Sequence, residues 1–254
     1  MRMVALLALV LTLIGCTGTA SGLRIAGSTS LQPVMERLAE GYRKAGGGRV
    51  IVQGGGTTAG VQAVLAGVAG LGAASRRLTA AESEQGLVEH IIAWDVLTVV
   101  VHPDNPVGRR GLTLAQLQAL FRGEVTDWAT VGGAPGPVHL VTREAGSGSR
   151  EAFRSLVGPV SPRAIVQNSA GGIRMTVMGD PRAIGYVSLG VARMGGVVAV
   201  PIDGKRPGEP GYPLVRPLSL VTLGPPRGEA AAFLRYIRSP EARRLIMEEG
   251  LVPE

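Results

Sequence analysis

Four short stretches of the chain combine glycine, serine and threonine in a way that suits the binding of a small anion. They read GSTS at 27–30, GGGTTAG at 54–60, GAASR at 72–76 and REAGSGS at 143–149. Small residues let backbone N–H groups approach a ligand closely, and hydroxyl groups add further hydrogen-bond donors. Arg143 adds a planar guanidinium that can bind an oxyanion through two hydrogen bonds. These residue types predict an oxyanion site.

One stretch of this kind cannot hold a dehydrated anion. The first N–H groups of a helix lack partners within the helix, and the aligned peptide dipoles place partial positive charge there. Each helix end contributes only about 0.3–1 kcal/mol, whereas burying an unpaired anion costs roughly tens of kcal/mol in an idealised apolar medium. Several helix N-termini must therefore converge on the anion, together with Arg143.

Strands and helices must alternate to bring these stretches together. A short strand is predicted at 23–27 and a helix at about 31–44, with Pro33 in its first turn, where a missing N–H costs little. RVIVQ at 49–53 predicts the next strand, and a helix should follow the second stretch. This alternation indicates an open α/β sheet, in which ligands bind at the carboxyl ends of the strands.

The pattern changes from Trp94 onwards. WDVLTVVV is a β-branched run that predicts a strand, and TLAQLQALF from Thr113 predicts a capped helix. A strand, the REAGSGS loop and a helix are expected over 137–157. The remaining predictions are strands at 183–192 and 213–223, a Pro/Gly-rich loop at 201–213, and one or two helices over 228–250 with a break at Pro240.

The beginning of the chain is typical of a secreted lipoprotein. An apolar run from Val4 to Ile14 follows Arg2 and is too short to span a bilayer as a mature helix. It ends in Leu-Ile-Gly-Cys, which resembles the bacterial lipobox, and Cys16 is the one cysteine of the chain. We expect residues 1–22 to be signal peptide and tether, with cleavage before Cys16 and lipidation of its thiol. The remainder would be held at the outer face of a bacterial membrane, in the periplasm or at the cell surface.

Charge and the histidine positions exclude several other classes of protein. The formal net charge is +7 without a dense run of Lys and Arg, so no nucleic-acid partner is expected, although a positive surface speeds the capture of small anions. His90, His102 and His139 have no acidic or cysteine companion at ligand spacing. We expect no metal site, no cofactor and no catalytic histidine.

The four stretches, in this order, resemble the phosphate-binding proteins of bacterial phosphate ABC transporters in their shorter lipoprotein form. The match covers essentially the whole chain beyond the signal peptide, and the arginine followed by Gly-Ser-Gly-Ser is its most specific part. The resemblance implies a two-lobed, type II (Venus-flytrap) periplasmic-binding-protein fold, in which helices flank mixed sheets. Lobe I would comprise 23–95 plus 197–254, and lobe II would comprise 96–196.

The same resemblance implies a function and a set of anion-binding residues. Inorganic phosphate would bind between the lobes and stabilise the closed form, which the membrane permease of an ABC importer would recognise. The chain would not be an enzyme. The implied anion-binding residues are Ser28, Thr29, Ser30, Thr57, Thr58, Ser75, Arg143, Ser147, Gly148 and Ser149, with Arg76 as a second cation in the cleft.

Two positions depart from the pattern of longer family members. Those members carry an aspartate where this chain has Ser75, and many carry another at Ala145. A buried proton acceptor rejects sulfate, which brings no proton, whereas a serine can accept or donate and therefore discriminates less. Glu144 or Glu151 is an alternative acceptor. Sulfate, molybdate and tungstate therefore remain alternative ligands of the same fold.

Two enzyme classes are weaker alternatives. GGGTTA at 54–59 fits a dinucleotide-binding fingerprint, but the acidic residue expected about twenty positions later is absent. Arg76 or Arg77 leaves room only for an NADP-dependent enzyme. A serine hydrolase is disfavoured because the chain has no G-x-S-x-G or S-x-x-K motif.

Overall fold

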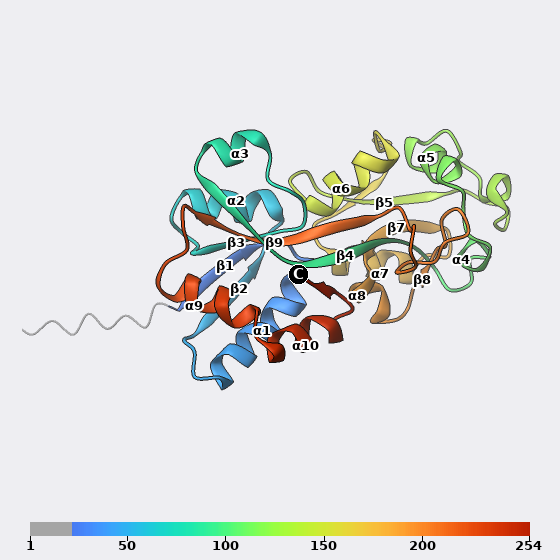
Figure 1. The fold of residues 1–254 in the computed structure, drawn as a ribbon. Helices are drawn as coiled ribbons and strands as arrows, with labels where there is room; N and C mark the ends of the chain where they lie inside the picture. Colours follow the sequence, from blue (N-terminus) through green and yellow to red (C-terminus); the bar gives the residue numbers. More distant parts are fainter. Residues whose placement is uncertain (1–21) are drawn as a thin grey trace, which may run out of the picture.

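Two lobes lie side by side and are joined by two long strands (Figure 1). The computed structural model describes residues 22–254, so Cys16 and the predicted signal peptide lie outside the described part. The joining strands are β4 (Leu87–Val101) and β9 (Val215–Leu223). The predicted two-lobed α/β fold is confirmed.

Lobe I holds the chain ends of the described region. Its elements are β1 (Leu23–Gly27), α1 (Gln32–Lys44), β2 (Val50–Gly54), α2 (Thr57–Leu65), β3 (Leu71–Ala74), α3 (Ala80–Glu84), α9 (Gly228–Ile237), α10 (Pro240–Glu248) and β10 (Val252–Pro253). The break at Pro240 separates two helices, because proline is accommodated in the first turn of α10 and Ser239 caps it.

Lobe II holds the middle of the chain. Its elements are α4 (Val107–Arg110), α5 (Leu114–Arg122), a 3₁₀ helix (Trp128–Val131), β5 (His139–Arg143), α6 (Gly148–Val157), β6 (Ile165–Gln167), α7 (Ala170–Met178), β7 (Ala183–Ser188), α8 (Leu189–Arg193) and β8 (Val198–Ala199). The strand predicted at 183–192 therefore ends at Ser188 and continues as α8. A short apolar run does not distinguish strand from helix.

One continuous path of strands crosses both lobes in the order β2-β1-β3-β9-β4-β7-β5-β6. In lobe I, β1 is parallel to β2 and β3, and β9 is antiparallel to both of its neighbours, β3 and β4. The first part of β4, up to Val96, pairs with β9, and Leu97–Val101 pairs with β7 of lobe II. A single strand thus belongs to both lobes.

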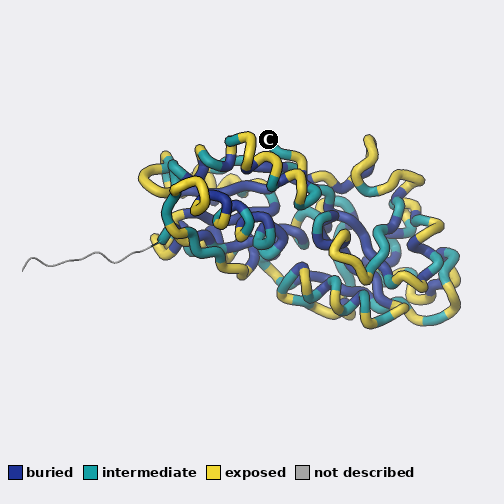
Figure 2. Tube along the Cα trace, turned by 90° about the horizontal axis from the view of Figure 1, so that it is seen from below, coloured by how far each residue is buried: buried dark blue, intermediate teal, exposed yellow. Residues whose placement is uncertain are grey.

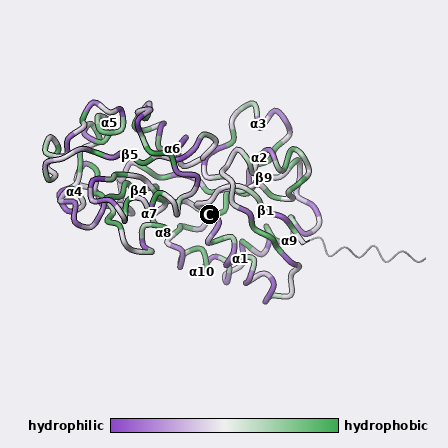
Figure 3. The backbone as a smooth tube through the Cα atoms, turned by 180° about the vertical axis from the view of Figure 1, so that it is seen from behind, coloured by the Kyte–Doolittle hydropathy of each residue, from purple (hydrophilic) through white to green (hydrophobic). Residues whose placement is uncertain are grey.

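Each lobe has its own apolar core. Figure 2 shows buried segments inside both lobes and exposed segments along their outside, and Figure 3 shows hydrophobic segments in both lobes. In lobe I, Tyr42 and Phe233 pack edge to face across α1 and α9. In lobe II, Phe153 stacks on Tyr186 with ring centroids 4.0 Å apart. No helix within residues 22–254 has the length and apolar character needed to cross a membrane.

The core residues of lobe II support a second crossing later in the chain than the expected boundary at 196/197. Val200, Ile202, Tyr212 and Leu214 belong to the same core as Trp128 in lobe II. β8 also pairs with the lobe II part of β4. Because residues 198–214 contribute to the core of lobe II, we propose that the return crossing lies at about residue 214/215, where β9 begins.

Candidate functional site

The N-termini of α1, α2, α6 and α7 meet where the two lobes touch. Ser30 Oγ of lobe I lies 3.0 Å from Ser149 Oγ of lobe II. The Thr58 backbone N–H donates to the Gly146 carbonyl oxygen at 3.0 Å. The Ala170 N–H, at the start of α7, donates to Thr29 Oγ1 at 3.2 Å. The predicted convergence of separate helix starts is therefore present in the structure.

On the lobe I side, the hydroxyl groups are buried and held by one another. Thr57 Oγ1, at the first residue of α2, accepts from the Ser75 N–H at 3.1 Å and lies 3.3 Å from Ser75 Oγ. Ser28 Oγ accepts from the Ser30 N–H at 3.3 Å. Gly56, the N-cap residue directly before α2, has φ +90°, a conformation that residues with a Cβ rarely adopt. The glycines of this stretch therefore shape the helix start on which Thr57 sits.

On the lobe II side, the REAGSGS loop comes very close to these hydroxyls. A Cβ on Gly148 would lie 2.4 Å from Thr57 Oγ1 and 2.7 Å from Ser75 Oγ, so only glycine fits while the lobes are in contact. Ser147 is buried and caps α6 by accepting from the Arg150 N–H at 3.3 Å. The small residues of the REAGSGS loop therefore permit the close approach of lobe II to the hydroxyl groups of lobe I.

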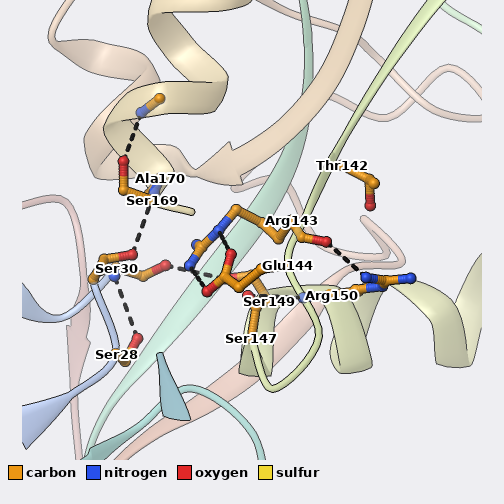
Figure 4. A network of polar contacts seen from close by, with 12 residues as sticks. Ser28, Ser30, Thr142, Arg143, Glu144, Ser147, Ser149, Arg150, Ser169 and Ala170 are labelled. Carbon is orange, nitrogen blue, oxygen red and sulfur yellow. Dashed lines mark hydrogen bonds and ion pairs between the residues drawn. The ribbon is translucent and has the colours of Figure 1, made fainter. Parts of the chain in front are cut away.

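Arg143, at the end of β5, is 2% exposed. Its Nε and Nη2 donate to the two carboxylate oxygens of Glu144 at 2.7 and 2.8 Å. Its backbone N–H donates to the Tyr186 hydroxyl, which also lies 2.8 Å from Thr142 Oγ1. Burial raises the pKa of Tyr186, so this hydroxyl stays neutral and fixes the end of β5. Figure 4 shows Arg143 and Glu144 pointing toward Ser30 and Ser149.

The Glu144 carboxylate lies at the start of α2 in the other lobe. Glu144 Oε1 is 3.1 Å from the place that a Cβ on Gly56 would occupy, and the Glu144 side chain is 25% exposed. A negative group thus already sits between Arg143 and a helix N-terminus, where both favour it. Both neighbours therefore stabilise the negative charge of Glu144 at this position.

Arg76 is not part of this cluster, contrary to the expectation of a second cation in the cleft. Its Nη1 and Nη2 donate to the two carboxylate oxygens of Glu82, each at 2.8 Å. The hydrogen bonds from Arg76 hold the pKa of Glu82 below its ordinary value. Glu82 faces back toward Arg76 because it forms a capping box with Thr79 at the start of α3. The neighbouring Arg77 pairs with Glu89 at 3.0 Å, so neither arginine is free for the phosphate of NADP.

Four residues of the cluster were not predicted from the sequence. Arg216 and Asp95 form a buried ion pair on β9 and β4, and Ser188 Oγ donates to Asp95 at 2.6 Å. Asp95 and Arg216 could have been noticed in the sequence, because each is a charged residue flanked by apolar residues within a strand. Ala170 was also missed, although Ser169 followed by small residues repeats the pattern of the other helix starts.

The part of the chain described by the structure contains no group of three or more His, Cys, Asp and Glu side chains placed to hold a metal ion. His139 pairs with Asp180 at 2.6 Å, and His90 lies 2.9 Å from Thr222 Oγ1. Both histidines therefore have structural partners away from the cluster.

The comparisons with known proteins agree with this geometry. Residues 16–241 match the PBP superfamily domain. The phosphate-binding protein PstS of Bacillus subtilis is 29% identical over 251 residues, which cover 92% of this chain and 81% of the relative. Among solved structures, a phosphate ABC transporter substrate-binding protein from Clostridium perfringens, with bound phosphate, has a TM-score of 0.86 at 32% identity, covering 91% of this chain and 99% of that one.

A second solved structure, an ABC-type phosphate transport receptor from Vibrio cholerae, has a TM-score of 0.73 at 34% identity, again covering 91% of this chain and 99% of that one. The family resemblance expected from the sequence is confirmed by these matches. With its two lobes, its shared strands and the profile match over most of its length, the chain belongs to the PBP superfamily.

Proposed function

We propose that this protein captures inorganic phosphate between its two lobes and delivers it to an ABC importer. The main observation behind this proposal is that four helix N-termini, from both lobes, converge beside the buried guanidinium of Arg143. The similar proteins from Bacillus subtilis, Clostridium perfringens and Vibrio cholerae are named for phosphate binding or transport, which supports the same ligand here. The proposed anion-binding residues are Ser28, Thr29, Ser30, Thr57, Thr58, Ser75, Arg143, Ser147, Gly148 and Ser149.

Binding replaces contacts within the protein by contacts to the anion. Ser30 and Ser149 share a hydrogen bond across the lobes, and Thr57 and Ser75 share another contact. An entering oxyanion takes over these hydroxyl donors. Hydrogen bonds to a charged group are worth about 1.5–3 kcal/mol each, against about 0.5–1.5 kcal/mol between neutral groups. The exchange therefore favours the anion-bound form.

Glu144 supplies the proton acceptor that Ser75 and Ala145 lack. Its carboxylate is held beside Arg143, and two hydrogen bonds from Arg143 fix its position. Hydrogen phosphate can donate a hydrogen bond to this carboxylate, whereas sulfate has no hydrogen to donate and meets only its negative charge. Phosphate is therefore the tetrahedral oxyanion that this site favours, and sulfate, molybdate and tungstate are the alternatives to be tested.

The two-lobed fold explains how binding is reported to the importer. The hydroxyl groups of lobe I and the REAGSGS loop of lobe II bind the same ligand only when the lobes are in contact. A ligand that binds the closed arrangement more tightly shifts the equilibrium toward it. The permease of an ABC importer then recognises that closed arrangement, and binding involves no chemical conversion of phosphate.

Calorimetric titration of the purified, phosphate-free protein tests this function. We expect phosphate to bind at least about tenfold more tightly than sulfate or molybdate, a preference of about 1.4 kcal/mol. Thermal unfolding checks the result independently, since a ligand present at a hundred times its Kd stabilises the folded state by about 2.7 kcal/mol. Binding of molybdate or sulfate without binding of phosphate would refute the assignment.

We also propose that a lipid on Cys16 anchors the protein outside the cell membrane, although this residue lies outside the described region. The lipobox-like sequence supports this location. The variant Cys16→Ser should be released into the soluble extracytoplasmic fraction, as fractionation and immunoblotting would show. Retention of Cys16→Ser in the membrane would contradict lipid anchoring.

A further inference from the structure

A second buried arginine contacts the site from the strands that join the lobes. Arg216, in β9, is 3% exposed, and its Nη1 donates to Ser149 Oγ at 2.7 Å and to the Ser75 carbonyl oxygen at 3.4 Å. Its Nε and Nη2 donate to Asp95 Oδ2 at 3.0 and 2.8 Å. Arg216 thus contacts one proposed anion-binding residue from each lobe.

The chemistry of the guanidinium fixes the direction of the Ser149 hydroxyl. A guanidinium only donates hydrogen bonds, so Ser149 Oγ must accept from Arg216. The hydrogen of Ser149 is then directed to another acceptor, and Ser30 Oγ lies 3.0 Å away on the side of the helix N-termini. From this geometry we infer that Arg216 is a positioning residue that makes Ser149 a hydrogen-bond donor to the bound anion.

Asp95 holds Arg216 in place for this role. The Asp95 side chain is 0% exposed, its Oδ2 accepts from Arg216, and its Oδ1 accepts from Ser188 at 2.6 Å. Asp95 and Arg216 lie directly opposite each other in the β4–β9 register. The guanidinium is therefore attached to the strands between the lobes, and Ser149 reaches it when the α6 start occupies the position seen here.

The effect passes through the hydrogen bond rather than through net charge. Asp95 neutralises Arg216 within hydrogen-bond distance, so the pair adds little net positive charge for an anion to sense. The donor to Ser149 remains. A role through Ser149 predicts that Arg216 and Ser149 are coupled in binding, which a purely structural ion pair would not show.

A double-mutant cycle on the purified protein, titrated with inorganic phosphate, tests the inference. The paired substitution Asp95→Asn/Arg216→Gln leaves no unpaired buried charge. We expect it to weaken phosphate binding about tenfold when Ser149 is present, the range expected for a hydrogen bond from a charged group. Together with Ser149→Ala, it should change Kd by less than about twofold.

The part-buried ion pair of Arg37 and Glu249, between α1 and α10, provides the matched control. Arg37→Gln/Glu249→Gln removes the same charges and should leave Kd unchanged. An equal loss of affinity from Asp95→Asn/Arg216→Gln with and without Ser149 would show a merely structural pair and overturn the inference. Full affinity of the paired variant would do the same.

A conservative variant decides the matter if the paired substitution does not fold. Arg216→Lys keeps the charge beside Asp95 but loses the fork that reaches Asp95 and Ser149 together. It should weaken phosphate binding when Ser149 is present and have no further effect in the Ser149→Ala background. An unchanged Kd would overturn the inference.

The inference rests on the proposed function, but an experiment can distinguish the failure of one from the failure of the other. If the unsubstituted protein binds molybdate or sulfate instead of phosphate, the phosphate assignment fails, and the same cycle titrated with that anion still decides the role of Arg216.

Discussion

Arg143 and Arg216 are both almost fully buried, and each forms an ion pair with a carboxylate, but the two carboxylates are held differently. Asp95 lies within a strand, is fully buried, and accepts hydrogen bonds from Ser188 as well as from Arg216. Glu144 lies in a loop, and its side chain is 25% exposed. A fully buried carboxylate fixed by two donor residues makes a permanent support, whereas Glu144 is a quarter exposed, accepts from Arg143, and can share that guanidinium with an incoming anion. This difference supports Arg143, rather than Arg216, as the arginine that meets the ligand in the proposed site.

The largest expected effect comes from changing the arginine that meets the ligand. Arg143→Lys replaces a planar fork by a point charge, so it should weaken phosphate binding about a hundredfold or more, given a cost of about 2–5 kcal/mol for breaking a buried charged pair. Calorimetry should show a smaller loss for Arg216→Lys. The reverse order, or an equal loss, would contradict the comparison.

The close contact between Gly148 of lobe II and Thr57 of lobe I can be broken without altering either arginine. Gly148→Ala would place a Cβ 2.4 Å from Thr57 Oγ1, so the lobes should no longer approach fully. We expect phosphate binding to weaken about tenfold, within the range of overpacking costs. Gly179→Ala, at the end of α7, has nothing closer than 3.5 Å and should bind as before. Unchanged affinity of Gly148→Ala would mean that this close approach is dispensable.

A third substitution tests the Glu144 carboxylate as the proposed hydrogen-bond acceptor for phosphate. Glu144→Gln removes the negative charge that repels sulfate while keeping an oxygen beside Arg143. The preference for phosphate over sulfate, measured as the ratio of the two dissociation constants, should fall roughly tenfold. Two charges about 4 Å apart interact by about 1–4 kcal/mol. Glu151→Gln, an exposed residue of the same lobe, serves as the control. A preference that survives in Glu144→Gln would place the selectivity elsewhere.

The smallest effect on binding is expected at Arg76, whose partner Glu82 lies outside the cluster. Arg76→Gln should leave the phosphate Kd unchanged and lower the free energy of unfolding by about 1 kcal/mol or less. Arg76 depresses the pKa of folded Glu82, so their pair stabilises the protein fully above the ordinary carboxyl pKa, about 4.3, and less as the pH falls through the depressed value. Denaturant unfolding should therefore show that the free energy of unfolding of Arg76→Gln falls less on acidification than that of the unsubstituted protein. A higher Kd for phosphate in Arg76→Gln would indicate that Arg76 does belong to the anion site.

The sequence was informative wherever one local stretch sufficed. The hydroxyl and glycine residues of the helix starts were identifiable because their composition serves the same local geometry each time, and the structure brings them together. Arg143 was identifiable because it directly precedes such a stretch.

Residues whose role depends on a distant partner were harder to identify. Asp95 and Arg216 are far apart in the chain and meet only because β4 and β9 are neighbours in an antiparallel register. Arg76 was misplaced because its side chain turns to Glu82, although Thr79 and Glu82 carry the spacing of a capping box. The proposed later crossing could not be predicted from the sequence, because a Pro/Gly-rich loop does not suggest that it supplies core residues such as Tyr212.

The position of β9 has a consequence for the order in which the two lobes can fold as the chain emerges. β9 lies between β3 and β4, yet both of those strands emerge far earlier than β9 does. Until β9 has been made, each has an open edge in lobe I, and open edges invite pairing with other chains. The strands of lobe II, by contrast, are complete before β9 emerges. Lobe II can thus fold first, and the proposed anion site is completed only after β9 has emerged.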